Sequence, residues 1–248
     1  MWQLFKRLVN TALYPLGYQI NKTYHGSIYQ DEAARRVIDL VHPTYTCTGV
    51  DRIYALIEAV GYVATNKLDG DFVECGVWRG GSTMAMAEAA LETGILPKIW
   101  LFDTFEGMTA PTEEDRDVYG TAMMGLQNIL RQGWMKVTES EVEQNLCLTS
   151  YPHEKFRLVR GPVEETIPDQ APEKIALLRL DTDWYQSTKH ELEHLYPRVV
   201  EGGVVIIDDY GDFEGAKRAT DEFFEALGTR PYLVPVAGHR VFIKHELK

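Results

Sequence analysis

Five short apolar runs constrain the fold of this sequence more than any other feature. They are DFVECGV (71–77), KIWLFDT (98–104), KFRLVRG (155–161), KIALLRLDT (174–182) and GGVVIIDD (202–209). The apolar residues of each run are continuous rather than alternating, which is typical of strands that are covered on both faces. Amphipathic helical stretches separate most of the runs, at 82–92, 186–198 and 213–227. The pattern therefore predicts an α/β fold built on a doubly wound, mostly parallel sheet.

The segments on either side of these runs follow other patterns. RPYLVPVA and RVFIKH flank Gly238 and His239, which predicts two closing strands joined by a tight turn, one of them antiparallel. Residues 29–66 are expected to be mostly helical and to cover one edge of the sheet. The stretch 105–136 is too long for an ordinary connection in such a fold. We expect it to be a lid or a substrate-binding loop, with a surface insertion or a dimer contact as alternatives.

Composition and charge narrow the classes of function. The 248 residues carry a formal net charge of −12, whereas a nucleic-acid-binding protein needs a basic surface to meet phosphates. An acidic chain suits a protein that gathers carboxylates around a cation or a cationic ligand. The three cysteines, Cys47, Cys75 and Cys147, are odd in number and widely spaced. We expect them to be reduced thiols in a cytoplasmic protein.

The first 20 residues have an apolar character that Lys6, Arg7 and Asn10 interrupt. This leaves neither the apolar stretch of a secretory signal nor a segment of transmembrane length. We expect a short amphipathic helix that packs on its own domain or on a partner subunit, rather than one that lies on a membrane.

Acidic residues follow four of the five predicted parallel strands. In open α/β sheets the ligand binds at the carboxyl ends of the strands. As many as six carboxylates would then gather along one edge: Glu74, Asp103, Asp181, Asp183, Asp208 and Asp209. Left unpaired, they would cost several kcal/mol through mutual repulsion and lost hydration. Two positive species could compensate them, a divalent metal ion and a cationic cofactor.

The spacing of the glycines in ECGVWRGGS helps to distinguish between possible cofactors. Their spacing, Gly76-x-x-x-Gly80-Gly81, departs from the G-x-G-x-x-G pattern of nicotinamide dinucleotide enzymes. That pattern is strict because the pyrophosphate rests on the helix N-terminus. S-adenosylmethionine has no phosphate, so a looser turn is sufficient, with Glu74 facing its amino-acid or sulfonium end and Asp103 gripping the ribose. Plain turn chemistry is the alternative for the glycines, and an acid at position 103 also occurs in NAD enzymes.

The remaining acids suggest a metal site. All-oxygen ligation by Asp181, Asp208 and Asp209 suits a hard ion such as Mg²⁺. Asp183 lies two residues beyond Asp181, on the same side if the strand persists, where a carboxylate beside a metal-bound hydroxyl can act as general base. The alternative is that Asp183 and either Asp209 or Asp212 cap the helices that follow. Helix caps would explain one acid at the end of each strand, but not the two pairs Asp181/Asp183 and Asp208/Asp209, so we favour a metal site.

A competing metal motif is HELEH at 190–194, which matches the H-E-x-x-H pattern of zinc hydrolases. On a helix spanning 186–198, Leu192 and Leu195 fall on the face that packs on the sheet, and His190 and His194 fall on the opposite face. A zinc hydrolase directs its histidines into a cleft, whereas these would point to solvent, away from the acids. We therefore interpret HELEH as part of a solvated helix face.

Four segments taken together resemble the macrocin O-methyltransferase family: DFVECGVWRGGS, LFDTFEGM, RLDTDWYQST and GGVVIIDDYGDFEGAKRATDEF. The resemblance covers about residues 40–245. Members of the family methylate sugar hydroxyls on macrolides such as tylosin and mycinamicin, and on the noviose of novobiocin. The resemblance implies a class I methyltransferase (Rossmann-like) fold, S-adenosylmethionine and Mg²⁺ as cofactors, and a homodimer.

The same resemblance implies roles for individual residues. Asp181, Asp208 and Asp209 match the metal ligands, Asp183 matches the catalytic base, and Asp181 counts with it as a catalytic residue. The matching cofactor positions are Glu74, Gly76, Ser82, Asp103, Thr104, Phe105, Gly161, Val163 and Glu164. PTYTCTG (43–49) corresponds to a mobile element that closes over the cofactor, which makes Tyr45 a lid residue, although Cys47 and Gly49 stand where methionine and serine are expected.

We accordingly expect an N-terminal helical extension with a lid, residues 1–66, and an S-adenosylmethionine-binding domain, residues 67–248, with an insertion at 105–136. The predicted reaction is methyl transfer to a sugar hydroxyl of a glycoside, a nucleotide sugar or a polysaccharide, with Asp183 removing the proton. A nicotinamide-dependent sugar oxidoreductase and a catalytically silent, dimeric binding protein are the alternatives. Neither a nucleic-acid partner nor stable membrane insertion is expected.

Overall fold

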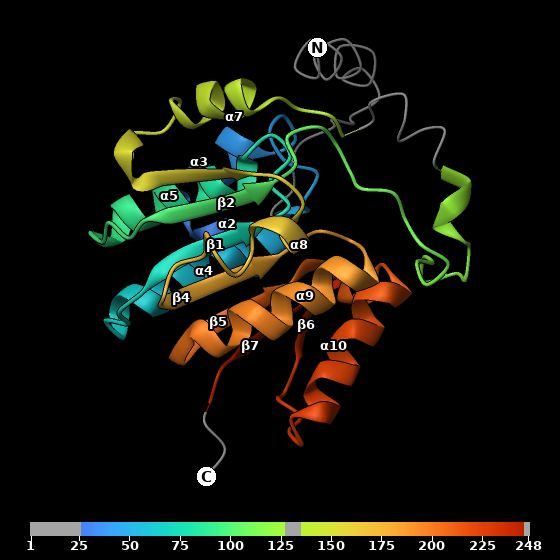
Figure 1. Cartoon of the computed structure of the whole chain (residues 1–248). Helices are drawn as coiled ribbons and strands as arrows, with labels where there is room; N and C mark the ends of the chain where they lie inside the picture. The colour runs from blue at the N-terminus through green and yellow to red at the C-terminus, as the bar shows by residue number, and fades with distance from the viewer. Residues whose placement is uncertain (1–25, 127–134, 246–248) are drawn as a thin grey trace, which may run out of the picture.

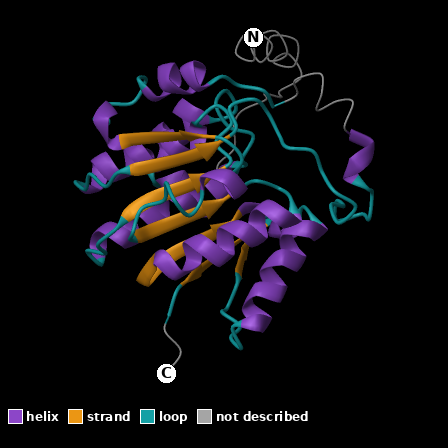
Figure 2. Cartoon of the chain, viewed as in Figure 1, coloured by secondary structure: helices purple, strands orange, loops and turns teal. Residues whose placement is uncertain are grey.

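The computed structural model describes residues 26–126 and 135–245 (Figure 1). Within these residues a seven-stranded sheet of order β3-β2-β1-β4-β5-β7-β6 lies between helices (Figure 2). The strands are β1 (Asp71–Cys75), β2 (Ile99–Asp103), β3 (Phe156–Arg160), β4 (Ile175–Leu180), β5 (Val199–Ile207), β6 (Val234–Val236) and β7 (His239–Ile243). Strands β1 to β5 pair in parallel, whereas β7 is antiparallel to both β5 and β6. The doubly wound sheet and the closing hairpin are therefore confirmed.

The helices alternate with the strands from β1 to β6. They are α2 (Gly26–Gln30), α3 (Glu32–Val41), α4 (Val50–Thr65), α5 (Gly81–Thr93), α7 (Glu139–Leu146), α8 (Val163–Thr166), α9 (Tyr185–Leu195) and α10 (Glu214–Ala226). Short 3-10 turns add η2 (Met123–Leu126), η3 (His153–Lys155), η4 (Tyr196–Arg198) and η5 (Asp208–Gly211). The three helices predicted between strands correspond to α5, to α9 continued by η4, and to α10.

Helices α3 and α4 lie over a face of the sheet, which corrects one prediction. At the start of α3 the Asp31 carboxylate accepts a hydrogen bond from the Ala34 amide, 2.8 Å away. Both helices bury one apolar side in the core that α5 shares, and α4 contacts β4, β5 and β6. The prediction that residues 29–66 cover an edge is wrong, because the apolar side of α4 extends across neighbouring strands. The division into an extension and a main domain stays a prediction.

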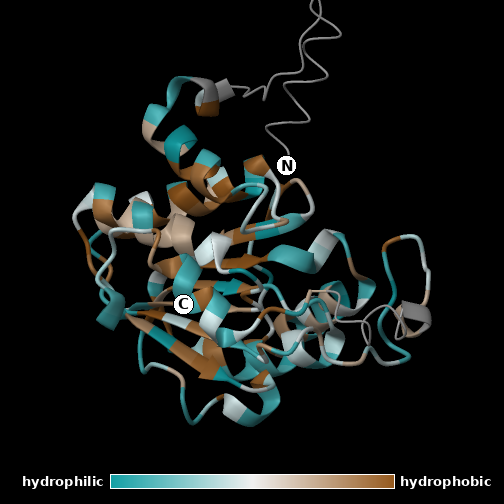
Figure 3. Ribbon diagram, turned by 90° about the horizontal axis from the view of Figure 1, so that it is seen from above, coloured by the Kyte–Doolittle hydropathy of each residue, from teal (hydrophilic) through white to brown (hydrophobic). Residues whose placement is uncertain are grey.

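Alternation along the strands divides the core into two clusters, one on each face of the sheet. The cluster under α3, α4 and α5 contains Phe72, Ile99, Leu101, Leu177 and Ile206. The cluster under α8, α9 and α10 contains Val73, Phe102, Leu178, Val205 and Ile207. In Figure 3 the hydrophobic colour is concentrated in the strands and in the helices beside them. A polar side chain that projects from one of these strands is therefore surrounded by apolar residues.

Two glycines allow loops to approach closely at the carboxyl edge of the sheet. A Cβ on Gly76, which has φ +80, would lie 1.8 Å from the carbonyl oxygen of Asp181. A Cβ on Gly81 would lie 2.6 Å from the Tyr45 carbonyl. The first contact joins the loops after β1 and β4. The second brings the segment 43–49 against the start of α5, so that this segment borders the same edge.

Other predictions fall partly or wholly outside the described residues. The amphipathic helix predicted within the first 20 residues lies outside them. Of the predicted insertion, residues 105–126 and 135–136 are described. Across the described ranges, no helix has both the length and the apolar composition that crossing a membrane requires.

Candidate active site

A cavity of about 550 Å³ opens at the carboxyl ends of the parallel strands. Most of the residues predicted to bind the cofactor line it: Gly76, Ser82, Asp103, Thr104, Gly161, Val163 and Glu164. The four predicted catalytic and metal-binding residues also line it: Asp181, Asp183, Asp208 and Asp209. Residues 46–49 complete the wall on the side of the predicted lid. The predicted positions therefore meet at one cavity, while their individual roles stay predictions.

The loops after β4 and β5 bring three carboxylates together. One oxygen from each of Asp181, Asp208 and Asp209 lies within 4.8 Å of the others. Asp208 and Asp209 are buried, and Asp181 is half-buried. These three residues are the set that the sequence predicts as metal ligands. Carboxylate oxygens in this number and proximity are suitable donors for a hard divalent ion.

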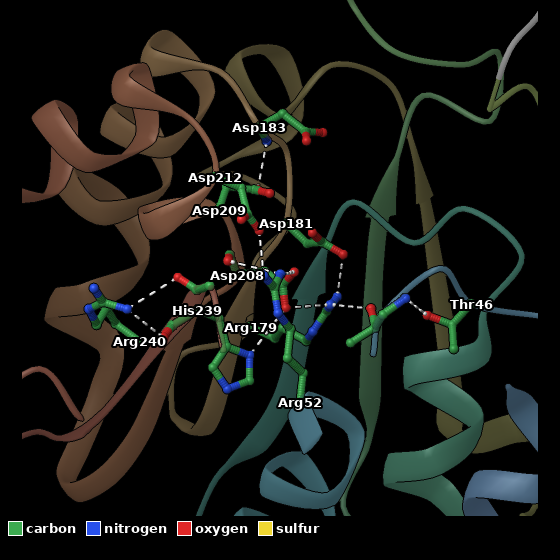
Figure 4. A network of polar contacts seen from close by, with 12 residues as sticks. Thr46, Arg52, Arg179, Asp181, Asp183, Asp208, Asp209, Asp212, His239 and Arg240 are labelled. Carbon is green, nitrogen blue, oxygen red and sulfur yellow. Dashed lines mark hydrogen bonds and ion pairs between the residues drawn. The ribbon is translucent and has the colours of Figure 1, made fainter. Parts of the chain in front are cut away.

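Arg179 is the central cation of the acid cluster (Figure 4). It belongs to β4 and its side chain is 2% exposed. Its Nη1 donates to Glu74 Oε1 at 2.8 Å and to Asp181 Oδ2 at 2.6 Å. Its Nη2 donates to Asp208 Oδ1 at 2.9 Å and to the Thr48 hydroxyl at 3.0 Å. One buried guanidinium thus joins β1, β4, the start of η5 and the predicted lid.

Arg52, from α4, supplies a second cation at the edge of the same cluster. Its Nη1 lies 2.8 Å from Asp208 Oδ2, and its Nη2 lies 2.5 Å from Asp212 Oδ2. The buried ring of His239 approaches Asp208 from β7, with Nδ1 at 3.4 Å from Oδ1. Burial alone would raise the pKa of Asp208, but the two guanidinium groups and His239 hold it well below its usual range. Asp208 is therefore held as an ion-paired carboxylate.

Asp209 and Asp183 lie in a contrasting environment. Burial, together with the charges of Asp183, Asp181 and Asp208, raises the pKa of Asp209 well above its usual range. Burial and the charge of Asp208 raise the pKa of Asp183 to about 7. Among the described residues, the recorded ion pairs place no lysine or arginine on either carboxylate. Ionisation is therefore disfavoured at both positions, although the charge of Arg179 partly offsets this at Asp183.

Asp183 reaches the cavity by a route that the sequence did not predict. Strand β4 ends at Leu180, so strand alternation does not carry Asp183 to the side of Asp181. Asp183 instead adopts a left-handed conformation with φ +66, and its amide donates to Asp209 Oδ2 at 3.0 Å. Neither following helix has a side-chain cap: the N-cap residues are Trp184 for α9 and Phe213 for α10. The capping alternative for these acids is therefore wrong.

The loop after β1 is held by the carboxylate of Asp103. Asp103 Oδ2 accepts hydrogen bonds from the amides of Val77 at 2.7 Å and Trp78 at 3.1 Å. Its Oδ1 accepts from the Phe105 amide at 2.8 Å. These backbone bonds fix the orientation of Asp103 at the wall of the cavity, between the loops after β1 and β2.

Three predicted cofactor positions lie behind the wall rather than on it. Glu74 is 1% exposed, and its carboxylate is bonded by Arg179 and by the Thr83 hydroxyl, so it does not face a cofactor as expected. Phe105 is buried in the core under α5. Tyr45 packs against that core, and its carbonyl accepts from the Gly81 amide at 3.0 Å. The neighbouring residues 46–49, rather than Tyr45 itself, line the cavity.

The described part of the insertion contributes to the cavity through residues 107–109 and through Met135. The Thr109 carbonyl accepts a hydrogen bond from the Trp184 indole at 3.0 Å. Asp115, 1% exposed, accepts from the Tyr185 amide at 2.9 Å. The sequence PTEEDRD gives no sign that one of its acids is buried, and Asp115 was missed for that reason.

The HELEH motif does not join the acid cluster, although its surroundings differ from the prediction. His190 and His194 are half-buried rather than solvated, with ring centroids 4.4 Å apart. His190 Nε2 lies 2.9 Å from the Ile167 carbonyl oxygen, since α9 packs against the segment after α8. Glu191 is fully buried and accepts from the Thr182 hydroxyl at 3.0 Å. Among the described residues, the metal-binding geometry falls on the three aspartates and not on this motif.

Comparison with known proteins agrees with the geometry of this site. The model of the family described as macrocin-O-methyltransferase (TylF) matches residues 10–245. This chain belongs to that family. Membership makes it an S-adenosylmethionine-dependent O-methyltransferase, with the class I fold predicted from the sequence, and it decides against the oxidoreductase alternative.

Named relatives are similar over most of their length. The chain is 31% identical to demethyldecarbamoylnovobiocin O-methyltransferase of Streptomyces niveus, over 89% of this chain and 83% of that one. It is 26% identical to mycinamicin III 3''-O-methyltransferase of Micromonospora griseorubida, over 96% and 93%. The solved structure of the O-methyltransferase NovP superposes with a TM-score of 0.72 at 29% identity, over 82% of this chain and 83% of that chain.

Proposed function

We propose that this O-methyltransferase acts on a sugar hydroxyl and requires Mg²⁺, with Asp183 as the general base. The observation that carries the proposal is the approach of three carboxylates, Asp181, Asp208 and Asp209, to within 4.8 Å of one another beside Asp183. The sugar is supported by the relatives, whose names specify methylation of a mycinamicin and of a rhamnosyl tetracenomycin, and by the related novobiocin enzyme.

The chemistry of the donor set fits Mg²⁺. Asp181, Asp208 and Asp209 would hold the ion, since hard cations prefer carboxylate oxygens. The raised pKa of Asp209, caused by burial and by neighbouring carboxylates, is the electrostatic condition that a divalent ion relieves. When bound, Mg²⁺ supplies a positive charge that favours ionisation of a neighbouring acceptor hydroxyl.

The cofactor would occupy the part of the cavity formed by the loops after β1, β2 and β3. Asp103, oriented by the amides of Val77, Trp78 and Phe105, is suitably placed to accept hydrogen bonds from the ribose hydroxyls. Gly161, Val163 and Glu164 would border the adenine. S-adenosylmethionine supplies the methyl group. The lid residues 46–49 would exclude water from the other side of the cavity.

Asp183 would accept the proton of the acceptor hydroxyl. A general base works best when its pKa lies near the operating pH, and the pKa of Asp183 is raised to about 7. The hydrogen bond from its amide to Asp209 Oδ2 fixes it next to the carboxylates that would hold the ion. Much of the acceleration is expected to come from alignment of the acceptor oxygen with the methyl group.

A binding assay combined with a turnover assay tests this proposal. S-adenosylhomocysteine is titrated into chelator-treated protein, and methyl transfer is then measured with and without Mg²⁺. The acceptors are sugars of the novobiocin, tetracenomycin and mycinamicin type and a panel of nucleotide sugars. We expect S-adenosylhomocysteine to bind, and one acceptor class to be methylated only with Mg²⁺. Turnover that is unaffected by chelator would refute the metal requirement.

The same experiment tests the proposed acceptor class. Cofactor binding without transfer to any of these acceptors would refute the sugar acceptors tested. The oligomeric state is measured alongside by light scattering, where the proposed homodimer predicts twice the mass of the chain.

A further inference from the structure

The segment 112–118 of the insertion bonds to both loops that carry the aspartates of the site. Asp115 Oδ1 accepts from the amide of Tyr185, two residues after Asp183. The Arg116 carbonyl accepts from the Glu214 amide at 2.8 Å, and the Val118 amide donates to the Asp212 carbonyl at 3.1 Å. One side of the segment thus holds the loop after β4, and the other holds the loop after β5.

Asp115 is the buried charged group of this segment. Its Oδ2 accepts from the Thr112 amide at 2.7 Å and from the Thr112 hydroxyl at 2.9 Å, which closes the segment on itself. A Cβ on Gly215 would lie 2.7 Å from Asp115 Oδ1, so the first turn of α10 fits closely against the carboxylate. A buried carboxylate bonded by several donors resists displacement, because leaving any of these groups unsatisfied is costly.

The same segment continues into the wall of the cavity. Residues 107–109 line it, and the Trp184 indole is bonded to the Thr109 carbonyl at 3.0 Å. Trp184 also packs edge-on against Phe213, with ring centroids 5.6 Å apart. The loop after β4, the loop before α10 and the insertion therefore meet at one packed contact, next to Asp183.

We infer that residues 112–118 are a brace that fixes the loop of Asp181 and Asp183 relative to the loop of Asp208 and Asp209, with Asp115 as its positioning residue. Asp115 does not touch the reacting atoms. It acts through the Tyr185 amide on the position of Asp183. The inference rests on the proposed function for its effect on turnover, but the brace itself is a property of the fold.

The first test is hydrogen exchange of the peptide that contains Tyr185, which needs no substrate. The Tyr185 amide is expected to exchange about tenfold faster or more in Asp115→Ala than in the wild type, because its acceptor is lost. Asp117→Ala is the matched control. It removes the same charge from the same segment, but within the described residues the Asp117 side chain accepts from the local amides of Tyr119 and Thr121 alone. Equal exchange in all three proteins would overturn the brace.

The second test separates positioning from general loosening. Asp115→Ala is expected to lower kcat by about tenfold to a hundredfold, since a small misplacement of reacting groups is enough for such a loss. The KM for S-adenosylmethionine should stay within about twofold of the wild type, because the proposed cofactor loops follow β1, β2 and β3. Asp115→Asn keeps an oxygen that can accept from Tyr185 and should recover part of kcat.

The possible results are distinguishable. A rise in the KM for S-adenosylmethionine as large as the fall in kcat would overturn the positioning role, as would equal losses in Asp115→Ala and Asp117→Ala. If Asp115→Ala does not fold, Asp115→Asn and Trp184→Phe, which removes the bond to Thr109, are compared in the same way. If the wild type methylates no acceptor, the proposed function has failed, and hydrogen exchange still decides the brace.

Discussion

Asp208 and Asp209 are consecutive residues at the end of β5, yet they lie in opposite electrostatic environments. Asp208 also lines the cavity, but Arg179 and Arg52 bond its two oxygens and, with His239, lower its pKa despite burial. Asp209 faces the cavity, where burial and the charges of Asp183 and Asp181 raise its pKa. Glu74 and Asp208, the interior half of the acid cluster, are ion-paired with arginine of the chain itself. At Asp183 and Asp209, the cavity half, burial and neighbouring carboxylates disfavour ionisation, and an external cation would favour it.

The difference distinguishes carboxylates that stabilise the fold from carboxylates that are suited to metal binding or proton transfer. A carboxylate that is fully bonded by arginine stabilises the fold, provided that both partners remain. A carboxylate with a raised pKa and no arginine is the kind of group that functional sites contain. Asp181 lies between the two halves, because one oxygen is bonded to Arg179 while the residue also lines the cavity.

The largest effect is expected for the cavity half. Asp183→Asn preserves shape but removes the base, so turnover should fall by about 10²–10⁴-fold. Binding of S-adenosylhomocysteine, measured by calorimetry, should persist. Asp169→Asn, a surface acid away from the cavity, serves as the control and should retain wild-type turnover. Turnover near the wild-type rate in Asp183→Asn would remove Asp183 from the role of base.

The next effect concerns the interior half and is measured as a change in stability. Arg179→Met leaves Glu74, Asp181 and Asp208 without their shared cation, and should lower the free energy of unfolding by about 3–5 kcal/mol. Urea denaturation followed by circular dichroism measures it. Arg52→Met should cost less, since the side chain of Arg52 is 15% exposed and that of its partner Asp212 is 42% exposed. Equal losses of unfolding free energy in the two variants would contradict the distinction between the buried Arg179 and the more exposed Arg52.

A smaller effect is expected in the pH dependence of stability. The pKa of Asp183 is raised to about 7 in the folded protein, so folding favours the protonated carboxyl. The resulting stability is present below about pH 4 and is lost as the pH rises through about 7. Chelator-treated protein should therefore melt at a lower temperature at pH 8 than at pH 6. Asp183→Asn should reduce that difference, and an unchanged difference would exclude Asp183 as its source.

The smallest effect is expected at the competing motif. His190→Ala removes one hydrogen bond, to the Ile167 carbonyl, and should cost about 1 kcal/mol. Neither His190→Ala nor His194→Ala should change turnover or the affinity for Mg²⁺. A loss of turnover or of Mg²⁺ affinity in either variant would mean that HELEH, and not the three aspartates alone, contributes to the metal site.

The sequence predicted the sheet and the gathering of acids because both follow from local rules. Continuous apolar runs identify buried parallel strands, and strand ends converge at one edge. The arginines were not predicted. Arg179 interrupts the apolar run KIALLRLDT and was a readable signal of a buried cation. Arg52 has no such signal, because its partner Asp208 lies 156 residues away in sequence.

Other parts of the site depend on tertiary contacts that periodicity does not encode. The left-handed turn at Asp183 is supported by its bond to Asp209, and strand alternation predicted a different route to the same cavity. Glu74 was expected to face the cofactor, but alternation along β1 directs it toward Arg179. Glu191 is buried although it lies within a polar motif, and the Thr182 hydroxyl donates to its carboxylate.

Direct Mg²⁺ titration tests most closely whether Asp209, together with Asp181 and Asp208, holds a divalent cation. Calorimetry is performed on chelator-treated wild type, Asp209→Asn and Asp169→Asn, each with S-adenosylhomocysteine present. We expect one Mg²⁺ to bind to the wild type and to Asp169→Asn, and this binding to be lost in Asp209→Asn. Wild-type protein that is folded and binds S-adenosylhomocysteine but not Mg²⁺, or equal binding in all three proteins, would contradict it.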